Sequence, residues 1–410
     1  MEIEVQSPQP YTRTIIIRVP ADEAQNRYNR VLSEIAKDAS WPGFRKGKVP
    51  KEIVRQHYED AIIDEIAEQY AKEGFSKALE QDEFTPMMRP RIEKELQFIS
   101  GSDFVIEIKV EVRPPIEIRQ YEGLSLSRKK EPVTEDEIDN VIENLRLRSG
   151  YFKPIEDRAA RAGDHALIDF QPKGEEEPSK RFFELDTSST VCIVGHKPGD
   201  TFDGHFEFPD DFPNPDLAGN IYDATVTLLE LKEMVLPELD ENFFAQFGEE
   251  VTSLEVLRDK LREDLDKMHA RDADRNLRAN ARQELVSRNP LEISPLVIEV
   301  AVANTIQNYW DVEKLSEDAI EQISNDLKPR ITQDIIADLL LGHIADKKEI
   351  EIDDETVKNH VMAIAQADGI QPESLYRHWK KIGRLETIRA EIKAERALDI
   401  IIEKAKITEI

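Results

Sequence analysis

The sequence contains a single cysteine, Cys192, and no long apolar run. One cysteine excludes a disulfide within the chain and a zinc site built from several thiolates. No window reaches the roughly 20 apolar residues that a membrane helix needs. The start, MEIEVQSPQP, lacks the basic region and apolar core of a signal peptide, so we expect a cytoplasmic protein with no membrane partner.

Positive charge is scarce, because 55 Lys and Arg stand against 84 Asp and Glu, a formal net charge of −29. Such a field repels phosphate, which argues against DNA binding by the general surface and restricts any nucleic-acid contact to a local patch. The 410 residues are 40% hydrophobic and 34% charged. This composition fits a soluble protein of two to four domains with modest cores.

Catalytic signatures are also missing. The chain has no Ser/His/Asp order, no G-x-S-x-G elbow and no phosphate-cradling glycine loop, and GHKPG (195–199) reads as a turn. His196 and His205 lie near Asp200 and Asp203. A metal site there is the weaker interpretation, because histidines of this kind are usually surface polar residues. We therefore predict no metal and no cofactor.

The first 114 residues predict a compact α+β domain. YTRTIIIRVP (11–20) is typical of a strand, and residues 21–40 favour a helix. RIEKELQFIS (91–100) and DFVIEIKVEVRP (103–114) alternate as two strands of a hairpin about Gly101. After residue 50 and before these strands, an apolar stripe at every fourth position predicts one long amphipathic helix. The stripe consists of Val54, Tyr58, Ile62, Ile66 and Tyr70.

Residues 115–150 read as an extended linker followed by a short helix. Thr134 and Glu137 have capping-box spacing at its start, and Gly150 stands where a C-terminal cap belongs. Residues 151–236 are rich in glycine, proline, phenylalanine and short β runs. That pattern predicts a small β-rich domain.

Residues 237–410 are predicted to be nearly all helix. Thr252 with Glu255 predicts a second capping box, and Ser294 before Pro295 predicts an N-cap followed by a first-turn proline. Further helices are expected over ITQDIIADLLLGHIADKKEI and RLETIRAEIKAERALDIIIEKAKI.

The loop WPGFRKGKVP (41–50) stands out from this acidic background. Residues 1–113 hold 17 Lys+Arg and 21 Asp+Glu, a net charge of −4, so the remainder carries −25 of the −29. The loop combines cations with aromatic rings and two glycines, and the cations continue into the next helix. The residues concerned are Trp41, Gly43, Phe44, Arg45, Lys46, Gly47, Lys48, Pro50, Lys51 and Arg55. Cations neutralise phosphates and an exposed ring stacks on a base or fills an apolar cleft, although a solvated turn between two helices is the simpler interpretation.

GFRKGKVP (43–50) resembles the ribosome-binding signature of bacterial trigger factor, a Gly-Phe-Arg-x-Gly-x-x-Pro pattern on a loop between two helices. Five positions match it, and Lys46 stands where the family commonly has lysine. The matching positions are Gly43, Phe44, Arg45, Gly47 and Pro50. The resemblance covers the whole chain: LPELDENFFAQFGEE (236–250) is similar to the family's entry into its helical domain, and AKIT (405–408) to its last helix. It implies that these loop residues, with Lys48, bind the ribosome.

The resemblance implies a multidomain α+β fold in four parts: a ribosome-binding domain (1–114), a linker and helix packed on the C-terminal domain (115–150), a shortened FKBP-like domain (151–236) and an all-helical chaperone domain with arms (237–410). The middle domain would lie at one end and the ribosome-binding domain at the other, and the two arms would enclose a cradle.

The function implied is that of an ATP-independent chaperone at the polypeptide exit tunnel. Its partners would be rRNA and protein of the large ribosomal subunit and nascent unfolded polypeptides, and not DNA. Roles in protein folding, protein transport and cell division come with the family, and a homodimer of the free chain stays open. Two other hypotheses are a free prolyl isomerase with helical substrate-holding arms and a periplasmic chaperone of similar build, which the missing signal peptide disfavours.

The middle domain resembles FKBP-type prolyl isomerases, whose apolar pocket twists an X–Pro amide over a barrier of roughly 18–20 kcal/mol. By position, Phe170 of IDF and Phe212 of FPDDF take the places of pocket aromatics, and Phe182 or Phe183 fills another. One piece is missing, because TVCIVGHKPGD reaches the Gly-x-x-x-Gly turn without the short helix that floors the family's pocket. The isomerase activity is therefore left open, with a domain for client contact or spacing as the alternative.

Client binding would fall on apolar faces of the C-terminal helices. The candidates are residues 254–289, residues 297–310 and the helix over 379–402 with Trp379 and Ile400–Ile402. The alternative for each position is that it belongs to the core, and the sequence does not separate the two.

Overall fold

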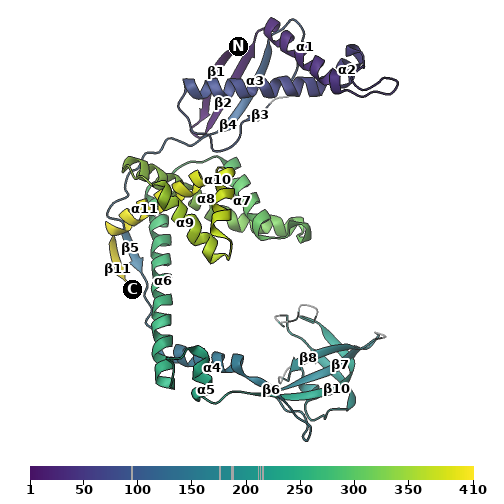
Figure 1. Ribbon diagram of the computed structural model, residues 1–410, viewed down its shortest axis with the longest axis vertical. Coiled ribbons are helices and arrows are strands. Elements are labelled where there is room, and N and C mark those ends of the chain that lie inside the picture. Colours follow the sequence, from purple (N-terminus) through teal and green to yellow (C-terminus); the bar gives the residue numbers. More distant parts are fainter. Residues whose placement is uncertain (94–95, 175–176, 186–188, 211, 213, 215–216) are drawn as a thin grey trace. The chain divides into compact units, whose positions relative to one another are not determined.

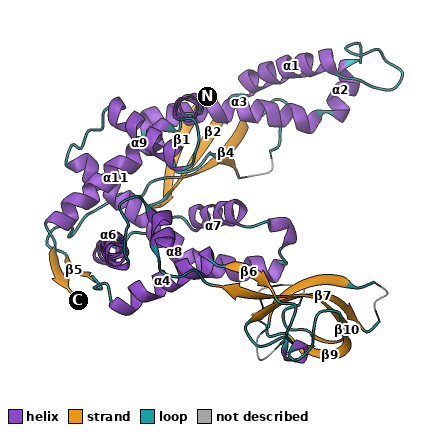
Figure 2. Cartoon of the chain, turned by 60° about the horizontal axis from the view of Figure 1, so that its bottom comes forward, coloured by secondary structure: helices purple, strands orange, loops and turns teal. Residues whose placement is uncertain are grey.

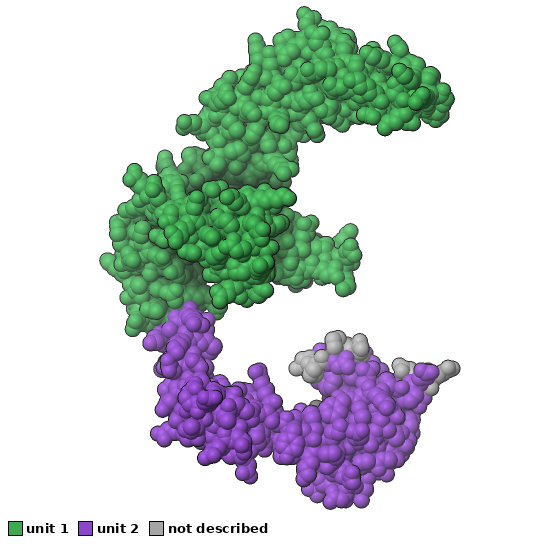
Figure 3. All heavy atoms as spheres, viewed as in Figure 1, with its two compact units in different colours: residues 1–129, 273–410 green, residues 130–272 purple. Residues whose placement is uncertain are grey.

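The computed structural model describes the chain except residues 94–95, 175–176, 186–188, 211, 213 and 215–216 (Figure 1). It divides into two compact units, coloured in Figure 3. The first unit comprises residues 1–129 and 273–410, and the second comprises residues 130–272. None of the helices in the described ranges combines the length and the apolarity that crossing a membrane requires.

The N-terminal part of the first unit is a four-stranded antiparallel sheet with helices on one face. The sheet order is β1-β2-β4-β3, with β1 Glu2–Gln9, β2 Thr12–Val19, β3 Arg91–Ile92 and β4 Phe104–Glu111. The helices are α1 Ala21–Asp38, α2 Lys51–His57 and α3 Glu59–Gln81. Isoleucines 15 and 17 of β2 and 106 and 108 of β4 alternate into the core, where Ile62, Ile66 and Tyr70 of α3 pack against them.

Three details of the predicted N-terminal domain were wrong. Strand β1 was not predicted, although Ile3 and Val5 pack against the core. The single long helix is two helices, because Tyr58 leaves the helical region with φ −124° and both ends α2 and precedes α3. The predicted strand over 91–100 pairs only at Arg91–Ile92, and residues 94–95 lie outside the described residues. Phe98 packs against the core although it is not in a paired strand, because its ring stacks on Tyr28 of α1 at 4.5 Å between ring centroids.

The C-terminal part of the first unit is helical. It contains the end of α6 Leu254–Arg288, followed by α7 Pro295–Tyr309, α8 Glu317–Lys347, α9 Asp354–Ala367, α10 Pro372–Lys381 and α11 Leu385–Glu403. Leu277 and Leu285 of α6 share a core with Leu340 and Leu341 of α8 and Leu398 of α11. This burial of one apolar face per helix holds the bundle together.

The segment before residue 129 belongs to this helical part. The Asn289 Oδ1 accepts hydrogen bonds from the backbone N–H of Arg119 (2.7 Å) and Gln120 (3.2 Å), and Asn280 accepts one from Ser127 (3.1 Å). Strand β5 Ser125–Arg128 pairs in parallel with β11 Lys406–Glu409. The predicted final helix through AKIT was therefore wrong, because the chain leaves α11 after Glu403 and pairs with β5.

The second unit contains a β domain with the sheet order β6-β10-β7-β8 and β9 paired to β10 (Figure 2). Its strands are β6 Tyr151–Pro154, β7 Asp164–Pro172, β8 Ser179–Glu184, β9 Thr201–Glu207 and β10 Ile221–Val235. Ala166, Ile168 and Phe170 of β7 alternate into a core rich in phenylalanine. The predicted mixture of an α+β N-terminal part, a β-rich middle and a helical C-terminal part is confirmed.

Helix α4 Glu135–Ser149 packs against the first half of α6 and against α5 Glu241–Phe244. The Thr134 hydroxyl accepts the Glu137 N–H at 3.2 Å, so the first predicted cap is confirmed. The second was wrong by one residue, because Ser253 and not Thr252 accepts the Val256 N–H at the start of α6. Arg258 of α6 bridges to Glu135 (2.7 Å) on α4.

Candidate functional site

Residues 41–50 form a loop that joins α1 to α2. Figures 1 and 2 both show this loop at the end of the helices, away from the β1-β2-β4 sheet. Three backbone hydrogen bonds shape it: Phe44 N–H to Trp41 C=O (3.0 Å), Gly47 N–H to Ala39 C=O (3.1 Å) and Lys48 N–H to Arg45 C=O (2.9 Å). Two successive turns therefore present the residues between them to solvent.

Two glycines make these turns possible. Gly43 has φ +88° and Gly47 has φ +76°, a region that L side chains rarely adopt. A Cβ on Gly47 would lie 2.5 Å from the Lys37 carbonyl oxygen, whereas one on Gly43 would meet no atom within 4 Å. Both glycines therefore occupy turn positions that favour glycine by φ, and only Gly47 is required by space as well.

The loop buries one residue and exposes the rest of its signature. Val49 is buried in the N-terminal core and anchors the loop's end, and Pro50 precedes α2 with φ −58°. Phe44 is 41% exposed although it is a large apolar ring. Arg45, Lys46 and Lys48 are exposed as well. The structure thus brings the predicted cations and the predicted aromatic residue together on one solvent-facing loop.

The cations of the loop are weakly held. Lys46 lies 3.3 Å from Asp38, but both side chains are more than two thirds exposed, so this pair stabilises the fold little. Within the described ranges, Arg45 and Lys48 have no ion pair. Their charges therefore remain available to a partner.

The structure adds one residue that the sequence did not suggest. His57, the last residue of α2, stacks on Trp41 with 3.8 Å between ring centroids and 25° between planes. The two residues are sixteen positions apart and follow no shared periodicity. Only the return of the chain from the loop through α2 reveals the contact.

The middle-domain candidates lie in the core of the β domain. Phe170 is 1% exposed and meets Phe206 edge-on at 5.1 Å between centroids. Phe212 is half-buried and contacts Phe208 at 4.7 Å. The structure thus places Phe170 and Phe212 in one aromatic cluster, bridged by Phe206 and Phe208, which contact each other at 6.2 Å.

Of the two candidates for the third aromatic position, Phe183 is the one buried in the same cluster. Phe182 points to the opposite face of the sheet, where it contacts Phe152. Between β8 and β9 the described residues contain only the short 3-10 turn Val191–Ile193, and Ile193 is fully buried. Ile193 therefore belongs to the same core cluster as Phe170.

His196 and His205, the two histidines considered as metal ligands, both make polar contacts. His205 bridges Asp223 (2.8 Å) and Glu207 (3.2 Å), and these hydrogen bonds raise the pKa of His205. His196 stacks on Phe202 at 3.7 Å between ring centroids. Across the described residues, no group of three or more His, Cys, Asp or Glu side chains is arranged to hold a metal ion.

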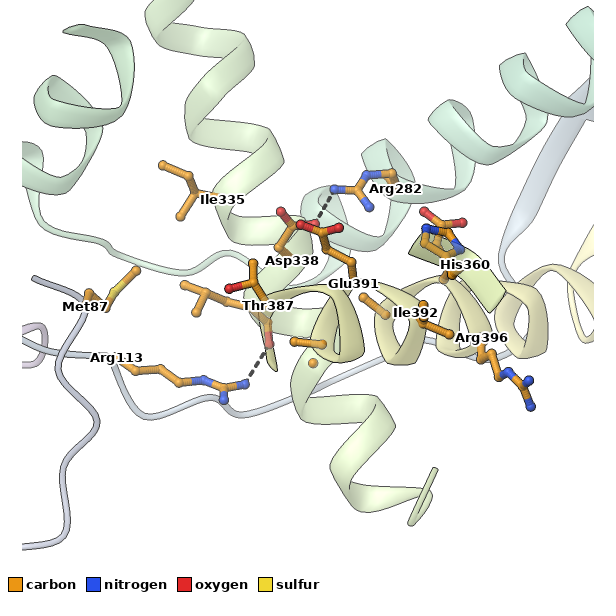
Figure 4. A pocket seen from close by; sticks show the side chains of 15 residues that line it. Met87, Arg113, Arg282, Ile335, Asp338, His360, Thr387, Glu391, Ile392 and Arg396 are labelled. Carbon is orange, nitrogen blue, oxygen red and sulfur yellow. Dashed lines mark hydrogen bonds and ion pairs between the residues drawn. The ribbon is translucent and has the colours of Figure 1, made fainter. Parts of the chain in front are cut away.

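A groove of about 740 Å³ lies in the first unit between α8 and α11 (Figure 4). Apolar and small side chains of the two helices line it, including Ile335, Leu339, Gly342, Ala390, Ile392 and Ala394. At its edges Arg282 pairs with Asp338, and the Arg113 guanidinium donates to the Leu339 carbonyl at 2.9 Å. Such a mixture of apolar lining and a few polar groups is typical of a ligand groove.

The predicted client faces are partly core. The predicted helix over 379–402 was wrong, because α10 ends at Lys381, a turn with Gly383 at φ +76° follows, and α11 begins at Leu385. Trp379 of α10 and Ile401 of α11 are buried and are not offered to a partner. The end of α7 differs, because Tyr309 is 79% exposed and Trp310 beside it is 38% exposed. Leu254, Val256 and Met268 of α6 are partly exposed too.

Comparison with protein families gives two matches. The model "Bacterial trigger factor protein (TF)" matches residues 1–145, and "Bacterial trigger factor protein (TF) C-terminus" matches residues 253–403. Together they cover well over half of the chain, including the loop, α8 and α11.

Full-length relatives agree with these matches. The chain is 27% identical to a trigger factor of Stutzerimonas stutzeri over 430 aligned positions, covering 100% of this chain and 96% of the relative. It is also 27% identical to a trigger factor of Koribacter versatilis, covering 97% of this chain and 95% of that relative. A solved structure, described as "Promiscuous Substrate Recognition in Folding and Assembly Activities of the Trigger Factor Chaperone", is similar with a TM-score of 0.50 and 20% identity, over 98% of this chain and 100% of that one.

Proposed function

Because the chain belongs to the bacterial trigger factor family, we propose that it is a ribosome-associated, ATP-independent chaperone that binds nascent polypeptides in the cytoplasm. The observation that carries the proposal is the exposed Phe44 beside Arg45 and Lys46 on a loop whose backbone is set by Gly43 and Gly47. Exposing a large apolar ring to water costs free energy that a docking partner recovers.

The charge distribution supports docking through this loop alone. Residues 1–113 carry a net charge of −4, and the rest of the chain carries −25. The phosphate-rich ribosome repels acidic surface and attracts an unpaired cation. The loop would therefore anchor the chain, with Arg45 and Lys46 facing phosphate or acidic groups and Phe44 filling an apolar cleft.

Unfolded client segments would bind the C-terminal helices. Tyr309 and Trp310 at the end of α7 and the groove between α8 and α11 offer apolar surface that the fold leaves open. Unfolded chains share exposed apolar side chains, so such surfaces bind many sequences. Client binding needs no nucleotide, because burial of apolar area supplies the free energy.

The middle domain would serve as a client-contact or spacer module. Phe170 has almost no exposed surface for a proline ring, and Ile193 packs in the same cluster. A protease-coupled assay of a prolyl peptide with the full chain tests this. Turnover that falls on replacing the half-buried Phe212 would instead support the alternative, a prolyl isomerase with helical arms.

Ribosome cosedimentation tests the docking site. Replacing Phe44, Arg45 and Lys46 together with alanine should abolish cosedimentation and leave the circular dichroism spectrum unchanged. The matched control replaces three exposed residues of the second unit, Tyr151, Phe152 and Lys153, which should leave cosedimentation intact. Unchanged binding by the loop variant would rule out this site.

A further inference from the structure

The stack between Trp41 and His57 gives the loop a second aromatic surface besides Phe44. One side of Trp41 packs against the N-terminal core, and the imidazole of the exposed His57 lies over the indole at 3.8 Å between centroids. The pair therefore forms a two-ring platform with the imidazole as its most exposed ring. The platform stands where the chain enters the loop and where α2 ends.

This platform is rigidly connected to the loop. The Trp41 carbonyl accepts the Phe44 N–H at 3.0 Å and so closes the turn that presents Phe44 and Arg45. The Tyr58 hydroxyl, directly after His57, donates to the Ser40 carbonyl at 3.4 Å, next to Trp41. One hydrogen bond and one ring contact thus hold the start of the loop against the end of α2, which preorganises the surface for a partner.

The segment around the platform carries a net positive charge. Residues 41–57 contain five Lys and Arg and a single acidic residue, Glu52, and Glu59 and Asp60 follow directly on α3, so residues 41–60 carry +2 in a chain of net charge −29. Arg55 lies on α2 two residues before His57 and is exposed. Stacked rings flanked by cations are the combination with which proteins bind unpaired nucleotides, because the rings hold the base and the cations hold the phosphates.

We propose that Trp41 and His57 form a stacking platform for an unpaired base of ribosomal RNA. The docking surface would then contact RNA by base stacking as well as by charge, and the inference rests on the proposed ribosome docking. RNA would engage both parts of this surface, because its phosphates pair with the cations and an unpaired base stacks on the rings.

Three variants of His57 in the full chain test the stack. Alanine removes the outer ring, and the loss of one stacked base corresponds to roughly a tenfold weaker binding to ribosomes. Phenylalanine keeps a flat ring without a charge, so H57F should bind within about threefold of the wild type. Lysine supplies a cation without a ring, so H57K should bind more weakly than H57F. Tyr151→Ala, at an exposed aromatic residue of the second unit, is the control and should bind like the wild type.

Two outcomes of the series would overturn the proposal. Wild-type binding by H57A would show that the outer ring makes no contact. Wild-type binding by H57K together with weak binding by H57F would show that His57 acts as a cation and not as a stacking surface.

Ultraviolet crosslinking identifies the partner class. Irradiation of the complex with intact ribosomes should join RNA to the peptide that contains residues 41–57, and the product should disappear on ribonuclease treatment. A crosslink from this peptide to ribosomal protein alone would overturn the choice of RNA.

The loop variant with alanine at 44, 45 and 46 separates this inference from the proposed function. If that variant binds ribosomes like the wild type, the docking function fails and the platform fails with it. If that variant loses binding while H57A retains it, only the stacking platform is wrong.

Discussion

Phe44 and Phe170 were both assigned to functional sites through the same resemblance, yet the structure places them in opposite environments. Phe44 stands in solvent on a glycine-framed loop, and Phe170 lies at the centre of an aromatic core. A short motif carries its own backbone requirements with it, as Gly43 and Gly47 show by their positive φ. A pocket depends in addition on an empty volume that neighbouring elements keep open, which a short motif does not specify.

The loop and the β domain also differ in the interactions that stabilise them. The loop depends on backbone hydrogen bonds and on Val49, while its functional side chains contribute little to the fold. The β domain depends on the side chains themselves, since Phe170, Phe183 and Phe206 make its core. Substitutions should therefore separate function from stability in the loop and combine them in the β domain.

The largest effect is expected from Phe170→Ala compared with Phe44→Ala. Truncating a fully buried phenylalanine costs about 3–5 kcal/mol of the free energy of unfolding, because a cavity remains. Removing the exposed Phe44 ring should change it by less than about 0.5 kcal/mol. Hydrogen exchange of the β7 amides measures the first and exchange of α1 and α3 the second. Unchanged protection of β7 in the Phe170 variant would contradict its core role.

Gly47→Ala and Gly43→Ala sharpen the role of the loop backbone. Alanine at 47 would carry both the strain of positive φ and a clash with the Lys37 carbonyl, costing about 2–3 kcal/mol of local stability. Alanine at 43 carries only the φ strain, about 1 kcal/mol. Ribosome affinity should fall more in the first variant, measured by cosedimentation with Phe44, Arg45 and Lys46 intact. Equal losses would mean that the Lys37 contact is unimportant.

Much of the fold could be predicted from local patterns. The alternation of β2, β4 and β7 and the Thr134 cap follow from period and side-chain chemistry within a few residues. The errors fall where distant partners decide. AKIT follows a helix-forming segment but pairs with β5, which lies about 280 positions away. Phe98 packs inward because its ring stacks on Tyr28, and not because residues 91–100 form a strand.

The loop could be predicted because its signature is contiguous. Its glycines, cations and aromatic residue lie within ten positions, so composition and order suffice to single it out. His57 could not be predicted, because its contact with Trp41 depends on the length and direction of α2. The groove between α8 and α11 is likewise formed by residues more than forty positions apart.

Acid should weaken the β domain and leave the loop unaffected. Burial alone would raise the pKa of Asp164, but hydrogen bonds from Arg158 (2.6 Å) and from the Arg161 N–H (2.8 Å) outweigh burial and lower it. A carboxyl with a lowered folded pKa stabilises the fold above its unfolded pKa of about 3.9, and this contribution is lost as the pH falls through the folded pKa.

Asp164→Asn tests this pH dependence. The variant should lose about 1–2 kcal/mol of stability at neutral pH and should show a flatter decline in acid, measured by urea unfolding of the second unit between neutral pH and about pH 3. Arg158 is a quarter exposed, which keeps the loss below that of a fully buried pair. A decline as steep as that of the wild type would place the acid sensitivity elsewhere.

The smallest effect is expected at the one ion pair of the loop. Lys46 and Asp38 lie 3.3 Å apart with exposed side chains, so Asp38→Asn should change the free energy of unfolding by less than about 0.5 kcal/mol. The substitution also removes a carboxylate that competes with the ribosome for Lys46, so ribosome affinity should rise, by about twofold at low salt and less at high salt. Glu34→Gln, an exposed acidic residue four positions earlier on α1, is the matched control for net charge. Equal gains in affinity in both variants would attribute the effect to general repulsion between acidic groups and the ribosome. A gain only in the Asp38 variant would show that Lys46 is a docking residue whose charge is partly occupied by Asp38 in the free chain.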